Sequence, residues 1–188
     1  PKDNIERAIK KGSGGAQGES WESIRYEGYG PGGVAIIVDT LTDNRNRTAS
    51  SIRTAFTKHG GSLGETNSVS FQFERIGFVQ YPYVSATVEE ILDAAIEIGA
   101  DDCHSSDSEH EISCNPDELH QITKGLEEKF GSPTNASLIW KPKNTIQIKE
   151  EQALTLFKLI EVLEDDDDVQ NVSSNLEISD DMISRLDN

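Results

Sequence analysis

The chain has 188 residues, of which 35% are hydrophobic and 27% are charged, and it carries a formal net charge of −17. This length allows one large or two small domains with a substantial core, and the composition is typical of a soluble globular protein. No apolar run approaches the length of a membrane span, which argues against a membrane partner and favours the bacterial cytoplasm, or the mitochondrial matrix if a transit peptide has been lost.

The first expected element is a short helix that ends at Gly12. Asp3 and Glu6 match a capping box, which predicts the start of this helix. Four basic residues surround its apolar face: Lys2, Arg7, Lys10 and Lys11. The glycine-rich segment 12–20 is typical of a flexible linker. We therefore expect residues 1–20 to be the end of a helical domain and a linker.

A glycine-rich turn comes next in the chain. Gly28, Gly30, Gly32 and Gly33 surround Pro31 and can adopt positive φ, which predicts a sharp turn before the following strand. The apolar, β-branched run after this turn predicts a buried strand over 34–41.

Helical and then alternating patterns follow this strand. The apolar residues of 47–58 have helical spacing, and Gly60 and Gly61 end the predicted helix. In residues 68–74, Val69, Phe71 and Phe73 alternate with polar residues, which predicts a half-buried strand. Together these elements form the first β-α-β unit.

Residues 76–149 show a similar alternation of strand and helix patterns and predict an inserted α+β domain, because 74 residues are too many for a loop. A strand is expected over 77–82, and Thr87 with Glu90 predicts a capping box for the next helix. A polar hairpin over 102–114, a helix that begins after Asn115 and an extended segment over 136–148 complete the module.

A helix over 151–164 and a strand over 169–178 are expected to complete the first unit. Between them, the acidic run 165–168 is expected to be a solvated helix end. The predicted fold class is α+β, with two ferredoxin-like α/β sandwich modules, one inserted in the other, plus a remnant of an N-terminal helical domain. The expected domains are 1–20, 21–75 with 150–179, 76–149, and a C-terminal tail over 180–188.

Three strings of this sequence closely resemble the YebC family: PKDNIERAIKKG, YEGYGPGGVAIIVDTLTDNRNRT and KHGGSLGETNSVSFQF. The resemblance implies two α+β modules, one inserted in the other, and a role in transcriptional regulation or, as in mitochondrial members, translational activation. Such proteins normally begin with a strongly basic helical segment that this sequence does not match. We therefore expect that most of the N-terminal helical domain is missing.

No set of residues predicts an enzyme, a cofactor or a metal. The segment GYGPGG lacks the Gly-Lys-Ser/Thr ending of a phosphate-binding loop. Cys103, His104, His110 and Cys114 do not converge on one ion if Ser108 and Glu109 form a two-residue turn, although Cys103 would then lie opposite Cys114. We expect both cysteines to be reduced and metal-free.

Charge is distributed unevenly along the chain. Residues 1–60 contain nine Lys and Arg against seven Asp and Glu, whereas residues 61–188 contain eight against 27. A basic end would orient the molecule on a polyanion, although an acidic excess also simply aids solubility.

The strongest candidates for nucleic-acid contact lie in and after the loop 42–48. Arginine forks suit phosphate oxygens, and asparagines can contact base edges or backbone. Alternatively, Asp43 or Asn44 caps the following helix and the arginines pair with nearby carboxylates. The candidates are the four basic residues of the first helix together with Asn44, Arg45, Asn46, Arg47, Arg53 and Lys58.

The leading functional hypothesis is a non-enzymatic regulator of gene expression that binds DNA. A ribosome-associated translation factor that contacts ribosomal RNA is the alternative, since structured RNA can be bound by shape and phosphate contacts. A protein-interaction module and an unrecognised enzyme are further alternatives. Protein partners are expected for the acidic half.

Overall fold

The computed structural model describes residues 20–179 and 181, so the predicted N-terminal helix, most of the linker and most of the C-terminal tail lie outside the described residues. The chain divides into two compact units. The outer unit contains the described residues up to Glu74 and from Pro142 onward, and the inserted unit is Arg75–Lys141. The described part is α+β and has two four-stranded sheets, which confirms the predicted fold class of two α/β sandwich modules.

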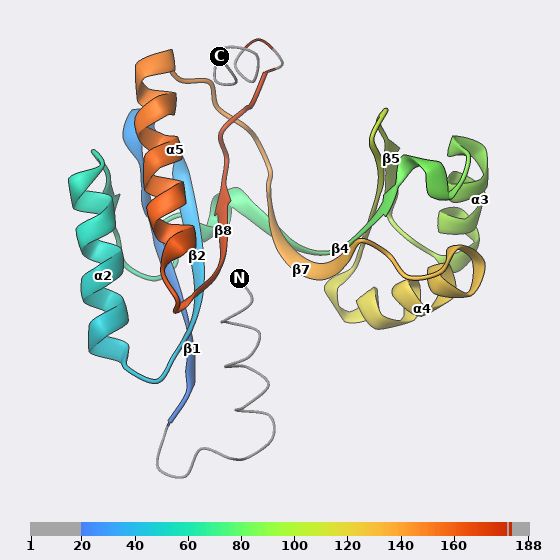
Figure 1. The fold of residues 1–188 in the computed structure, drawn as a ribbon, viewed down its shortest axis with the longest axis horizontal. Helices are drawn as coiled ribbons and strands as arrows, with labels where there is room; N and C mark the ends of the chain where they lie inside the picture. Colours follow the sequence, from blue (N-terminus) through green and yellow to red (C-terminus); the bar gives the residue numbers. More distant parts are fainter. Residues whose placement is uncertain (1–19, 180, 182–188) are drawn as a thin grey trace. The chain divides into compact units, whose positions relative to one another are not determined.

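The outer unit is a sheet with the strand order β3-β1-β2-β8, and each strand pairs antiparallel with its neighbour. Helices α2 and α5 pack against this sheet (Figure 1). The elements are β1 (Glu22–Tyr29), β2 (Ala35–Thr42), α2 (Arg45–Lys58), β3 (Ser62–Leu63), α5 (Glu150–Asp165) and β8 (Val169–Ser174).

The core of the outer unit is formed by alternate residues of β2 and of the position before it, and by the apolar stripes of the two helices. Val34, Ile36 and Val38 are fully buried and lie in one cluster with Phe56 of α2 and Leu159 of α5. Side chains alternate between the two faces of a strand and return to the same side of a helix every three or four residues. The apolar residues of the strand and of both helices therefore face the same core.

The hairpin between β1 and β2 turns through Gly32 and Gly33, whose φ angles are 74° and 79°. Gly28 and Gly30, which were also expected to adopt positive φ, do not. Gly28 instead lies within β1, where an added Cβ would be 2.6 Å from the carbonyl oxygen of Ser62. Its small size allows β3 to pair closely with β1.

The inserted unit has the strand order β5-β6-β4-β7 and its own buried cluster, which includes Val79, Ile91, Ile112, Ile122 and Leu126. Helices α3 and α4 contribute to this cluster. The elements are β4 (Phe73–Pro82), α3 (Val88–Ile98), β5 (Asp102–Ser105), β6 (Glu109–Cys114), α4 (Leu119–Phe130) and β7 (Asn135–Pro142).

The strand predicted over 68–74 is wrong for most of its length. Ser70–Gln72 forms a 3₁₀ turn, Phe71 is 66% exposed, and the strand begins only at Phe73 and continues to Pro82. The strand that follows α2 in the outer sheet is β3. Strand β1 was not predicted, because its glycines indicated a turn.

The boundaries of the inserted unit also differ from the expectation. Residues 142–149 group with the outer unit, because the N–H of Lys143 donates to the Gln72 carbonyl (2.9 Å) and Ile146 forms a β-bridge with Leu176. The extended segment expected over 136–148 therefore ends its strand at Pro142.

The hairpin of β5 and β6 has a longer loop than the two-residue turn considered above. Cys103 lies opposite Ile112, and Cys114 lies opposite Gly77 of β4, so the two thiols do not face each other. Burial raises the pKa of both thiols. In the described ranges, no three His, Cys, Asp or Glu side chains are arranged to hold a metal ion.

Candidate nucleic-acid interface

The first turn of α2 is fixed by side chains from its own loop. The Asn44 side chain accepts a hydrogen bond from the N–H of Arg47 (3.1 Å), so Asn44 is the N-cap of the helix. The N–H of Asn44 in turn donates to the hydroxyl of Thr42 (2.9 Å), which is buried. Asn44 thus performs the capping role that was the alternative to base contact.

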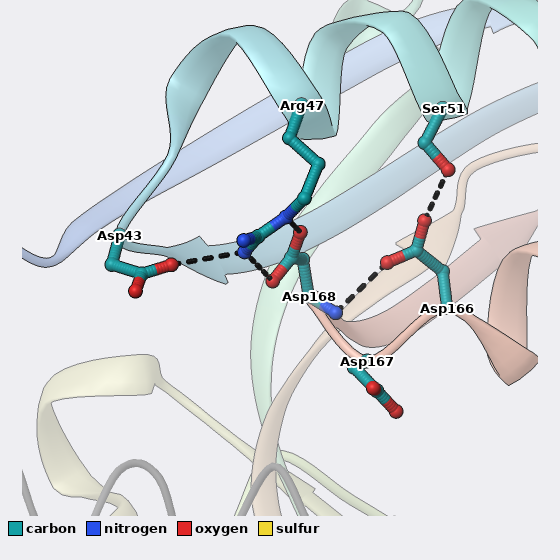
Figure 2. Close-up of a pocket in the computed structure, with 6 residues that line it drawn as sticks. All are labelled: Asp43, Arg47, Ser51, Asp166, Asp167 and Asp168. Atoms are coloured by element: carbon teal, nitrogen blue, oxygen red, sulfur yellow. Dashed lines mark hydrogen bonds and ion pairs between the residues drawn. The ribbon is translucent and has the colours of Figure 1, made fainter.

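Arg47 is held by two carboxylates (Figure 2). Its Nε donates to Oδ2 of Asp168 (3.1 Å) and its Nη2 to Oδ1 of the same carboxylate (2.8 Å), while Nη2 also lies 2.9 Å from Oδ1 of Asp43. The hydrogen bonds to Asp168 outweigh partial burial and raise the pKa of Arg47 further above its usual value. The Arg47 guanidinium therefore joins the start of α2 to the loop before β8.

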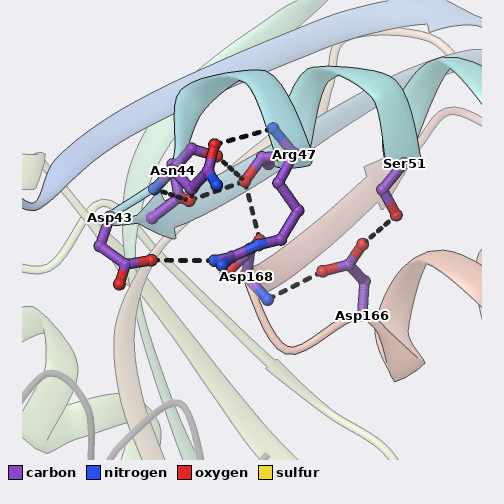
Figure 3. A network of polar contacts seen from close by, with 8 residues as sticks. Asp43, Asn44, Arg47, Ser51, Asp166 and Asp168 are labelled. Atoms are coloured by element: carbon purple, nitrogen blue, oxygen red, sulfur yellow. Dashed lines mark hydrogen bonds and ion pairs between the residues drawn. The ribbon is translucent and has the colours of Figure 1, made fainter.

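The acidic loop 166–168 makes further bonds to α2 (Figure 3). Thr48 donates to Oδ2 of Asp168 (2.8 Å), and Ser51 donates to Oδ2 of Asp166 (2.5 Å). The N–H of Asp168 donates to Oδ1 of Asp166 (2.9 Å). Asp168 is only 3% exposed, so the expectation of a solvated helix end is wrong for this residue.

A surface pocket of about 350 Å³ lies beside this network. It is lined by Asp43, Arg47, Ser51, Asp166, Asp167 and Asp168. Four carboxylates outnumber the single guanidinium, which is itself paired, so the pocket repels phosphate rather than attracting it. The pocket itself is therefore a poor candidate for nucleic-acid contact.

The outward side of α2 carries basic and short polar side chains. Arg45 has a side chain that is 68% exposed, and it contacts Glu22 at 3.3 Å, where both groups face solvent. Arg53 and Lys58 are exposed and form no ion pair with any other described residue. The other exposed residues of this side are Asn46, Ser50, Thr54 and Thr57.

This side of α2 is unusual for so acidic a chain because positions 44–64 contain no Asp or Glu. At 3.6 residues per turn, Asn46, Ser50, Arg53 and Thr57 share the outward face, whereas Arg47 and Ser51 lie on the flank that meets the acidic loop. Lys58 lies at the far end of that flank, and Arg45 lies on the opposite flank. The candidate residues therefore fall into two groups. Asn44 and Arg47 stabilise the fold, and Arg45, Asn46, Arg53 and Lys58 are exposed.

Lys2, Arg7, Lys10 and Lys11 lie outside the described residues. The sequence analysis did not identify Asp168 and Glu27 as important positions. Glu27 is 1% exposed and accepts bonds from three backbone N–H groups, and the only local signal for Asp168 is its place directly before a predicted strand. Neither position belongs to a recognisable motif.

Comparison with known proteins supports the resemblance found in the sequence. The family model Transcrip_reg, described as the TACO1/YebC second and third domain, matches residues 21–176. The chain belongs to the TACO1/YebC family. The crystal structure of a conserved hypothetical protein, Aq1575 from Aquifex aeolicus, is similar to the chain at 48% sequence identity and a TM-score of 0.84, covering 96% of this chain and 74% of that chain.

The TACO1/YebC family is generally regulatory rather than enzymatic, and membership of it indicates a role of the transcription-regulator type. The matched residues 21–176 include both units and the whole of α2. Within the described ranges, none of the helices has the length and apolar character needed to cross a bilayer.

Proposed function

We propose that this chain is a non-enzymatic regulator of gene expression that binds double-stranded DNA through the exposed side of α2. One observation carries the proposal: in a chain with a net charge of −17, positions 44–64 contain no acidic residue and α2 exposes Arg45, Arg53 and Lys58. Clustered exposed cations favour phosphate contact, and the carboxylate that Arg45 contacts, Glu22, is an exposed and weak partner.

The spacing of the two arginines supports a duplex as the target. Arg45 and Arg53 are eight residues apart, which corresponds to about 12 Å along the helix axis. The major groove of B-DNA is about 12 Å wide, so a helix placed across it can reach phosphates on both strands. Ser50 lies between these two arginines in the sequence, and Thr54 and Thr57 follow Arg53. Their short hydroxyl side chains can donate to phosphate oxygens.

Structured ribosomal RNA is the second candidate. The same hydroxyl side chains favour it, because they are too short to reach far into a groove and suit recognition by shape and backbone contact. A ribosome-associated translation factor would use the same exposed side of α2.

The test is a charge reversal on the proposed surface. The double substitution Arg45→Glu with Arg53→Glu should weaken the binding of nucleic acid by the chain. It should also reduce the slope of log affinity against log salt by about 2, since two phosphate contacts are lost. Binding would be measured by fluorescence anisotropy, with duplex DNA and folded ribosomal RNA fragments as separate probes.

The matched control is Lys124→Glu with Lys158→Glu, which makes the same change in net charge at two exposed sites on other helices, α4 and α5. Equal weakening by both pairs would show a global charge effect and refute the α2 surface. A large loss with RNA only would favour the translation factor. If binding to neither probe is weakened, the nucleic-acid contact does not lie on α2.

A further inference from the structure

Helix α3 of the inserted unit exposes a line of large apolar side chains. Val88 is 44% exposed, Leu92 is 42% exposed and Ile96 is 68% exposed. Val84, in the turn that precedes the helix, is 91% exposed. Successive positions in this set are four residues apart, so the three on the helix lie along one side of it. Val84 precedes them at the same spacing in the sequence. We call Val84, Val88, Leu92 and Ile96 the α3 stripe.

The stripe is distinct from the side of α3 that enters the core. Ile91, Ala94 and Ala95 are buried in the cluster of the inserted unit. Helix α4 packs near the last turn of α3, where Ile98 lies against Gly125 and Glu97 pairs with Lys129 (2.7 Å). The stripe residues on α3 are therefore not needed to close the core.

An acidic line runs beside the stripe. Each stripe residue on α3 is followed directly by a carboxylate, namely Glu89, Asp93 and Glu97. Glu89 and Asp93 are exposed and make no ion pair with another described residue. An apolar line and an anionic line thus lie parallel along one helix.

The charge around the α3 stripe indicates which kind of partner could bind there. Residues 75–141 contain thirteen Asp and Glu against four Lys and Arg. A second copy that docked through its own inserted unit, or an anionic lipid surface, would bring like charge against Glu89 and Asp93. A cationic amphipathic helix would bury its apolar line on the stripe and place its basic line beside the carboxylates.

We propose that the α3 stripe is a docking surface for a basic, amphipathic helical segment of a partner protein. Contiguous exposed apolar side chains with a polar border are characteristic of protein interaction sites. Burial of the apolar line would supply most of the affinity, and the carboxylates would set orientation and select a cationic partner. This surface is independent of the nucleic-acid contact proposed for α2.

The test uses two synthetic helical peptides that share an apolar line and differ only in the adjoining line, which is lysine in one and glutamate in the other. The whole chain should bind the lysine peptide and not the glutamate peptide. Replacing Val88, Leu92 and Ile96 with Gln should weaken binding of the lysine peptide by about tenfold or more, with only a small change in melting temperature, because these side chains do not belong to the buried cluster.

A matched control removes exposed apolar groups elsewhere. Leu154→Gln with Val162→Gln on α5 changes residues that are 45% and 43% exposed, and it should leave peptide binding unchanged. The variant Glu89→Lys with Asp93→Lys should reverse the preference toward the glutamate peptide.

Three results would overturn the proposal. The first is equal binding of both peptides by the unmodified chain. The second is an equal loss of binding in the stripe and control variants. The third is concentration-dependent self-association in sedimentation experiments that the stripe variant abolishes, since a second copy would then be the occupant.

Discussion

Two arginines at the start of α2 lie two positions apart and have different surroundings. Arg47 donates two hydrogen bonds to the buried carboxylate of Asp168, whereas Arg45 makes one contact to Glu22 at the surface. A buried carboxylate that loses its partner retains the cost of its desolvation, but an exposed pair is largely replaced by water. The two arginines should therefore differ strongly in their contribution to folding.

Replacement of Arg47 by Met should lower the free energy of unfolding by about 2 kcal/mol, a value reduced from that of a fully buried pair because the Arg47 side chain is 48% exposed. Arg45→Met should change it by less than about 0.5 kcal/mol. Arg47→Lys should recover only part of the loss, since an ammonium cannot reproduce the fork. Urea denaturation measures all three. Equal effects of the Arg45 and Arg47 changes would contradict this assignment.

Residue types and spacing in the loop 42–48 predicted the start of the following helix but not the partners of its side chains. Asn44 followed by a helical pattern predicts a cap, and the structure has that cap. The partner of Arg47 lies 121 positions away, and no local pattern pairs them. Long-range ion pairs depend on the packing of whole elements, so the sequence could not separate a structural arginine from an exposed one.

At the scale of elements, a buried glutamate organises the connection between β3 and β4. Glu27 of β1 accepts hydrogen bonds from the N–H groups of Asn67 (2.8 Å), Val69 (3.2 Å) and Ser70 (2.7 Å), and from Nε of Arg25 (3.0 Å). Burial opposes ionisation of this carboxyl, but these hydrogen bonds hold its pKa below the ordinary value. One side chain thus replaces the strand pairing that this segment lacks.

Glu27→Gln should lower the free energy of unfolding by about 2 kcal/mol at pH 7, because an amide NH₂ faces backbone donors. Since the pKa is depressed on folding, the carboxylate stabilises fully above its unfolded pKa of about 4.3 and loses this effect as pH falls through the folded pKa. The difference between the two proteins should therefore be constant near neutral pH and shrink in acid. Urea titrations across this range measure it, with the exposed Glu128→Gln as control.

Helices were easier to predict than strands. The capping box of Thr87 and Glu90 exists as predicted, and amphipathic spacing located α2 and α5 to within a few residues. Strand β1 was missed because Gly28 and Gly30 indicated a turn and Glu27 gave no sign of burial. A strand is defined by its neighbours in the sheet, and those neighbours lie far away in the sequence.

At the scale of the molecule, the inserted unit begins and ends in adjacent strands. β4 and β7 are neighbours in its sheet, and the cluster around Val79, Ile112 and Leu126 is its own. A segment that has its own hydrophobic core, and whose first and last strands are neighbours, meets the requirements of an independent domain.

A fragment of residues 73–142 should therefore fold alone and unfold cooperatively in urea. A fragment of residues 73–130 lacks β7 and should fail to do so, which makes it the matched control. Circular dichroism and NMR chemical-shift dispersion distinguish the two. If residues 73–142 give a collapsed state without fixed packing, the inserted unit depends on the outer one.

The bond between Arg47 and Asp168 also has a consequence for biosynthesis. Arg47 and the rest of α2 leave the ribosome long before Asp168 and β8, which pairs with β2. The outer unit therefore has a high contact order and cannot close until its last strand emerges, whereas the inserted unit is complete earlier. Throughout that interval the nascent chain carries Arg47 without its Asp168 partner, so α2 is at its most cationic while the protein is still being made.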